Sequence, residues 1–141
     1  MFSPSREQAR RFLIDAWDKR RQGMPQTPLE TLAADIVALH PEYQRLLERG
    51  EAALEREWTP EQGETNPFLH LSLHLAVEEQ LSIDQPPGIR AAFTTLAARH
   101  GERHAALHHV MDCRGEVMWQ AQRQQRAPDS AAYLDCLRHR A

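Results

Sequence analysis

Hydrophobic residues recur every three or four positions along most of the chain, which is the pattern of amphipathic helices. The alternation with a period of two that a half-buried strand requires is almost absent. The pattern therefore predicts an all-α fold, with residues 1–141 forming a single helical-bundle domain of four main helices plus short extra helices. The main helices are expected near residues 5–22, 28–47, 67–83 and 102–125, and the short ones near 89–99 and after 129.

Capping signals mark several helix starts. Ser5 begins a capping box, and Thr27 with Glu30 forms a second one, in which each side chain bonds the backbone N–H of the other residue. Asn66 is placed to cap the third main helix. Gly101 predicts a stop before the fourth main helix, although an uninterrupted helix would cost only about 1 kcal/mol at this glycine and stays open.

Two of the main helices carry chemically active side chains at four-residue spacing. Residues four apart lie on the same face of a helix, so each set forms one polar ridge on an otherwise apolar surface. The fourth main helix also has Gly115, which we expect on its inner face, where it would let another group approach closely. The ridges are His70, His74 and Glu78 on the 67–83 helix, and His104, His108 and Asp112 on the 102–125 helix.

Imidazole and carboxylate are common ligands of transition metals, and helical bundles build metal sites from facing helices. We expect the two ridges to face each other and to hold a divalent transition metal, which is iron, zinc or nickel. An open coordination position would admit a small-molecule ligand. The primary candidate ligands are His70, His74, Glu78, His104 and His108, and further candidates are Asp112, Glu116, His40 and His100.

Interpretations without a metal stay open for these residues. A hydrogen-bonded network of histidines and carboxylates would satisfy the buried polar atoms by itself. His40 stands before Pro41, which should break the second main helix, so its ring either bonds a backbone carbonyl there or serves as an extra ligand. Glu30 is explained by its capping role.

Composition narrows the classes of function. The 141 residues carry a net charge of −3, which gives no electrostatic basis for nucleic-acid binding. Charged residues interrupt every apolar run, so we expect no membrane span and a cytoplasmic location. Cys113 and Cys136 do not have the spacing of a metal motif, and we expect reduced thiols. The oligomeric state is not set by the sequence.

A resemblance covers nearly the whole chain. The chain resembles a small bacterial family of domains of unknown function in the blocks FSPSREQARRF, NPFLHLSLHLAVEEQLSIDQPPGIR, HAALHHVMDCRGEVMWQAQR and PDSAAYLDCLR. The HxxxHxxxE and HxxxHxxxD spacings are also similar to hemerythrin-like bundles and to metal-binding bundles related to the DNA-damage-inducible DinB proteins. Hemerythrin-like chains draw ligands from all four main helices, whereas the first main helix here has no histidine. This departure argues against a diiron oxygen carrier and favours a mononuclear or asymmetric site.

Two classes of function follow. The first is a metal-binding protein with its site between the 67–83 and 102–125 helices, and whether it is an enzyme stays open. The second is a non-catalytic interaction or adaptor protein, in which the histidines form structural hydrogen bonds and the polar residues 120–126 meet a partner.

Overall fold

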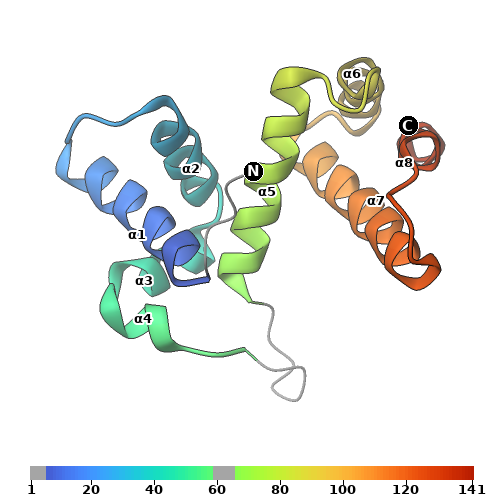
Figure 1. Ribbon diagram of the computed structural model, residues 1–141. Helices are drawn as coiled ribbons and strands as arrows, with labels where there is room; N and C mark the ends of the chain where they lie inside the picture. The colour runs from blue at the N-terminus through green and yellow to red at the C-terminus, as the bar shows by residue number, and fades with distance from the viewer. Residues whose placement is uncertain (1–5, 59–65) are drawn as a thin grey trace. The chain divides into compact units, whose positions relative to one another are not determined.

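The computed structural model describes residues 6–58 and 66–141, which form eight α-helices and no strand (Figure 1). The all-α prediction is confirmed, while the capping box predicted at Ser5 lies outside the described residues. None of the described helices is long and apolar enough to cross a membrane. The helices are α1 (Arg6–Gln22), α2 (Pro28–Ala38), α3 (Pro41–Glu48), α4 (Glu51–Glu55), α5 (Pro67–Ile83), α6 (Ile89–His100), α7 (Arg103–Gln124) and α8 (Ser130–Arg140).

The chain divides into two compact units, Met1–Leu75 and Ala76–Ala141, and the boundary falls inside α5. Each unit buries its own cluster of hydrophobic side chains. The single four-helix bundle over residues 1–141 therefore stays a prediction, and the two units are described separately below.

In the first unit, α1 packs against α2, α3 and α4. The predicted capping box begins α2: the Glu30 backbone N–H donates to Thr27 Oγ1 at 3.2 Å, and the Thr27 N–H donates to Glu30 Oε1 at 2.9 Å. Lys19 on α1 donates to the other Glu30 oxygen at 2.6 Å. This bond and the Thr27 N–H lower the pKa of Glu30, because both stabilise the carboxylate. Glu30 thus joins α1 to α2 in addition to its predicted capping role.

Arg10 on α1 fixes the start of α5 in the first unit. Its guanidinium is buried and donates to the backbone carbonyls of Leu54 at 3.0 Å and Arg56 at 2.7 Å, at the end of α4. The same group lies over the rings of Trp58 and Phe68, 5.1 and 4.9 Å from their centroids. One cation therefore satisfies backbone carbonyls and packs against an aromatic residue in the first turn of α5.

Local signals set both ends of α5. Asn66 Oδ1 accepts the N–H groups of Phe68 and Leu69, so the predicted cap is confirmed. After the helix, Asp84 accepts the backbone N–H of Arg90, and this bond contributes most to lowering the pKa of Asp84. The Arg90 side chain in turn donates to carbonyls in the last turn of α5, those of Leu81 and Ser82. Hydrogen bonds between Arg90 and the end of α5 therefore close the turn that leads into α6.

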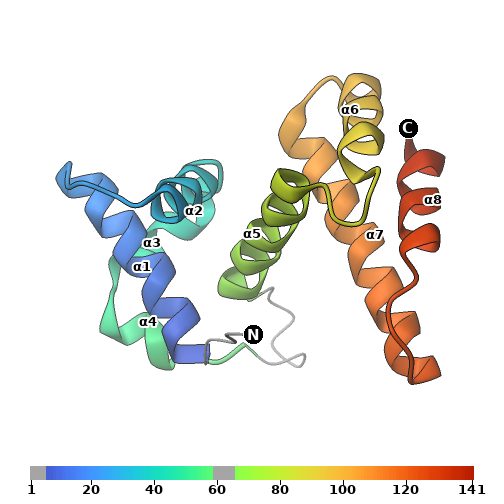
Figure 2. The same cartoon turned by 45° about the horizontal axis from the view of Figure 1, so that its top comes forward.

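In the second unit, α6, α7 and α8 pack against one another (Figure 2). Gly101 has φ +73°, a left-handed conformation that glycine adopts without strain, and it ends α6. The stop predicted at Gly101 is confirmed, so His100 closes α6 and is not part of the helix that carries His104. The buried stripe of α7 consists of Ala106, Leu107, Val110, Cys113, Val117 and Ala121.

Candidate metal centre

His40 joins α2 to α3 and is buried, with 2% of its surface exposed. Pro41 begins α3 and has no backbone N–H, so α2 cannot continue through it. The imidazole Nδ1 lies 2.8 Å from the carbonyl oxygen of Ile36. A carbonyl can only accept, so Nδ1 carries the proton and Nε2 has the lone pair. The bond to a backbone carbonyl is confirmed, and it fixes the tautomer that a metal-binding histidine usually has.

Three imidazoles of the first unit form a nearly equilateral triangle. Their ring centroids are 5.0 Å apart for His40 and His70, 4.8 Å for His40 and His74, and 4.9 Å for His70 and His74. Tyr43 stacks on His40 at 5.3 Å with a 6° angle between the rings, and it meets His70 edge-on at 5.8 Å. The four-residue spacing on α5 predicts the contact of His70 with His74, and the turn before α3 adds His40 to the group.

The second unit contributes the other pair of predicted histidines. His104 and His108 lie one turn apart on α7, with ring centroids separated by 4.4 Å and an angle of 60° between the planes. Both are half-buried beside the apolar stripe of the helix. The pair is the one that the four-residue spacing predicts.

Glu78, a predicted ligand on α5, is bound by an arginine of its own unit. Both carboxylate oxygens accept hydrogen bonds from Arg103 at the start of α7, at 2.5 and 2.9 Å. Only 11% of the Glu78 side chain is exposed, so the ion pair satisfies a carboxylate that is largely withdrawn from water. This bond raises the pKa of Arg103. A metal bound at Glu78 would have to share this carboxylate with Arg103.

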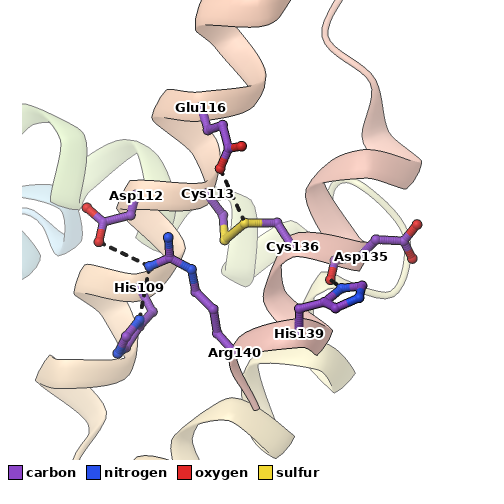
Figure 3. Close-up of a disulfide and its surroundings, with 8 residues drawn as sticks. All are labelled: His109, Asp112, Cys113, Glu116, Asp135, Cys136, His139 and Arg140. Carbon is purple, nitrogen blue, oxygen red and sulfur yellow. Dashed lines mark hydrogen bonds and ion pairs between the residues drawn. A yellow bond between two sulfur atoms is a disulfide. The ribbon is translucent and has the colours of Figure 1, made fainter.

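The further candidates on α6 and α7 are also engaged with α8. Asp112 accepts a hydrogen bond from Arg140 Nη1 at 3.2 Å, and Glu116 Oε2 lies 4.0 Å from Cys136 Sγ (Figure 3). His100 Nε2 donates to the Arg140 carbonyl oxygen at 2.9 Å. These three predicted residues thus contact α8, which is a structural role that the ridge pattern does not indicate.

His109 belongs to the same cluster, and the ridge pattern does not predict it as a ligand. Its ring stacks on His100 with centroids 4.2 Å apart, and its Nδ1 accepts a hydrogen bond from Arg140 at 3.1 Å. The proton of the neutral ring is therefore on Nε2. Burial lowers the pKa of His109, as do the neighbouring His100 and Arg140, while Asp112 acts in the opposite direction.

Cys113 and Cys136 form a disulfide between α7 and α8 (Figure 3). The expectation of two reduced thiols is therefore wrong for this structure. The spacing of 23 residues carries no motif, and only the packing of α8 on α7 brings the two Cα atoms to 5.8 Å, within the range that a disulfide requires.

His40 and His74 in the first unit, and His104 and His108 in the second, each have a ring nitrogen that could bind a metal ion. Nitrogen donors of this kind suit zinc, nickel and iron and are poor ligands for magnesium or calcium. Within the part of the chain that the structure describes, the chemistry of a candidate centre therefore rests on imidazoles more than on carboxylates.

The sequence of residues 5–139 matches the family model for a domain of unknown function, DUF1841. The chain belongs to the DUF1841 family. This confirms the resemblance to a family of domains of unknown function, and the family description supplies no activity. No curated protein and no solved structure matches the chain, so the likeness to hemerythrin-like and DinB-like bundles stays an interpretation of the histidine spacing.

Two features of this DUF1841 chain have weak sequence signals. Tyr43 lies three residues after His40 across a helix start, and this spacing could have suggested their stacking. Arg103 precedes His104 by one residue, but nothing local relates it to Glu78, which is 25 residues earlier. An ion pair between residues this far apart in the sequence depends on how the helices pack.

Proposed function

We propose that the chain binds a divalent transition metal, with His40 and His74 as the candidate ligands in the first unit and His104 and His108 as the candidate ligands in the second. His70 is the neighbouring alternative donor in the first unit. The single observation that supports the proposal most is the bond from His40 Nδ1 to the Ile36 carbonyl, because it leaves the Nε2 lone pair directed away from that carbonyl.

The environment of the first unit's histidines supports the same proposal. His74 is 1% exposed and His40 is 2% exposed, so both imidazoles are removed from water. Burying several polar rings together is unfavourable unless their nitrogens share bonding partners. One metal ion can bind several imidazole nitrogens at once, and the close packing of three rings keeps the entropic cost of assembling them low.

The imidazole donors favour zinc, nickel or iron. Glu78 is a less important candidate ligand than the ridge pattern predicts. Arg103 already neutralises that carboxylate, so a site built from imidazoles is simpler than the mixed site expected from the ridges. A coordination position not filled by protein would bind water or a small-molecule ligand, where the metal would act as a Lewis acid.

The decisive test is the metal content of untagged protein. We expect bound metal in the wild-type chain, lost in His40→Ala and His74→Ala if the first unit binds it, and in His104→Ala and His108→Ala if the second unit does. The matched control His139→Ala, on the exposed face of α8, should retain it. The variants that lose the metal then identify the unit that binds it. Metal-free wild-type protein that also fails to bind added zinc would overturn the proposal.

Two measurements guard against variants that simply unfold. Binding of Co²⁺ to the wild-type chain should give the visible absorption of a nitrogen-coordinated ion, with no mutation involved. A chelator should lower the melting temperature, because a ligand that binds only the folded state stabilises it by about 2.7 kcal/mol at 100 times its Kd. Circular dichroism of each alanine variant then separates lost ligation from lost folding.

An adaptor function is the second candidate, and one observation favours it. Trp119 on α7 is 55% exposed, and it lies beneath Arg123 and next to the partly exposed Met118. Tryptophan and arginine are enriched at protein interfaces. If this is the function, Trp119→Ala should abolish partner capture without changing stability, and chelation should leave the melting temperature unchanged.

A further inference from the structure

The disulfide between α7 and α8 presents two unequal sulfurs. Cys113 is fully buried within the hydrophobic cluster of the second unit, whereas Cys136 is only half-buried. An attacking thiolate must approach a sulfur along the S–S axis and therefore needs access from solvent. Cys136 is the more exposed of the two cysteines, so attack is favoured at Cys136 Sγ, with Cys113 Sγ as the leaving group.

Glu116 is placed to receive the reduced form of Cys136. Its Oε2 lies 4.0 Å from Cys136 Sγ (Figure 3). A disulfide sulfur has no proton to donate, so this contact is not a hydrogen bond while the disulfide is intact. Once the bond is broken, the Cys136 thiol can donate to this carboxylate. The same negative charge opposes the approach of an anionic thiolate to Cys136.

Several contacts besides the disulfide hold α8 in place. Arg140, one turn after Cys136, donates to both Asp112 Oδ2 and His109 Nδ1. Leu137 is fully buried, and Tyr133 donates to Gln80 on α5 at 2.8 Å. These contacts would keep the two thiols near each other after reduction.

We propose that Cys113 and Cys136 form a reversible thiol–disulfide couple that exchanges with an external dithiol. A thiolate of the dithiol attacks Cys136 Sγ, the Cys113–Cys136 bond breaks, and its electron pair stays on Cys113 Sγ, which takes up a proton. The second thiolate attacks the mixed disulfide. The dithiol leaves as its own disulfide, Cys136 Sγ takes up a proton, and two electrons have passed to the chain.

The test begins with the full-length chain purified without reductant. Alkylation and mass measurement should find no free thiol before treatment and both cysteines free after dithiothreitol in the absence of denaturant. Limiting alkylating reagent should label Cys136 before Cys113. Helix content should survive reduction, and oxidised dithiothreitol should restore the intramolecular disulfide in monomeric protein.

The charge of Glu116 gives a sharper measurement. Glu116→Gln should speed reduction about fivefold at low salt, because a unit charge 4 Å away contributes about that factor in water. The gain should largely disappear in concentrated salt, which screens exposed charges. Asp135→Asn is the matched control: its carboxylate pairs with Arg138 and points away from the disulfide, so the rate should not change.

Arg140→Gln tests how α8 is retained. Without its bonds to Asp112 and His109, the reduced variant should re-form the disulfide more slowly and give more linked dimers than the wild-type chain. Three results would overturn the proposal: free thiols in protein purified without reductant, reduction that requires denaturant, and loss of the helices on reduction. If Arg140→Gln and the wild-type chain re-form the disulfide at the same rate, Arg140 has no role in retaining α8.

Discussion

Arg103 and Glu78 form a two-pronged ion pair between the start of α7 and the later part of α5, with N–O distances of 2.5 and 2.9 Å. The two side chains differ in their surroundings. Glu78 is 11% exposed and Arg103 is 57% exposed, and the guanidinium also lies 5.5 Å from the ring centroid of Phe93. Because the carboxylate is largely withdrawn from water, it depends on this arginine more than an exposed acid would.

Arg103→Gln should therefore lower the free energy of unfolding by about 1–3 kcal/mol, since a sheltered carboxylate would lose its cation. Urea unfolding measures the loss. Arg138→Gln is the control, because its partner Asp135 is exposed and the pair should contribute less than about 1 kcal/mol. In the double variant with Glu78→Gln the losses should be less than additive. Fully additive losses would show that the two residues do not act as a pair.

Gly115 and Gly101 should respond in opposite directions to the same change. Gly115 lies inside α7, and a Cβ added to it would meet no atom within 4 Å beyond the helix's own backbone. Gly115→Ala should therefore raise the free energy of unfolding by about 0.5–1 kcal/mol. Gly101 also has open space, but its φ of +73° strains any residue with a side chain, so Gly101→Ala should destabilise the chain. Thermal melts of both variants test the pair, and a loss of stability in Gly115→Ala would contradict the open surroundings of this glycine.

Gly115 also shows where the sequence pattern alone was insufficient. The pattern on α7 contains more than one apolar stripe, and the stripe through Met111 and Met118 predicts Gly115 on the inner face. In the structure the buried stripe instead runs through Val110, Cys113 and Val117, and Gly115 is exposed. Which stripe is buried depends on where α6 and α8 pack. The sequence of α7 alone does not determine those positions.

Local signals were more informative than long-range ones. The capping box at Thr27, the cap at Asn66 and the stop at Gly101 involve residues within one turn of each other, so their types alone predict the geometry. The histidine pairs on α5 and α7 follow from helical spacing for the same reason. The disulfide joins residues 23 apart, and its formation depends on tertiary packing alone.

The unfolding free energy should fall below about pH 6.5, in part because of His109. Burial, His100 and Arg140 lower the pKa of this histidine in the folded chain. The unfolded chain therefore binds a proton first as the pH falls through its ordinary pKa, which stabilises the unfolded state. His109→Gln keeps an acceptor for Arg140 and should reduce the fall between about pH 7 and pH 5. His139→Gln on α8 is the control histidine, and an equal effect of the two variants would contradict the role of His109.

Tyr133 should ionise far above the ordinary range for a tyrosine. Burial raises its pKa to about 12, and its hydroxyl donates to Gln80 Oε1 at 2.8 Å. An unfolded tyrosine ionises near pH 10, so the unfolded state gains stability relative to the folded one as the pH rises above about that value. Phenolate absorbance during an alkaline titration should show a late step that Tyr133→Phe removes and Tyr43→Phe leaves in place. At neutral pH, Tyr133→Phe should cost about 1 kcal/mol because Gln80 loses its donor. A late step that persists in Tyr133→Phe would show that this hydroxyl is not the buried one.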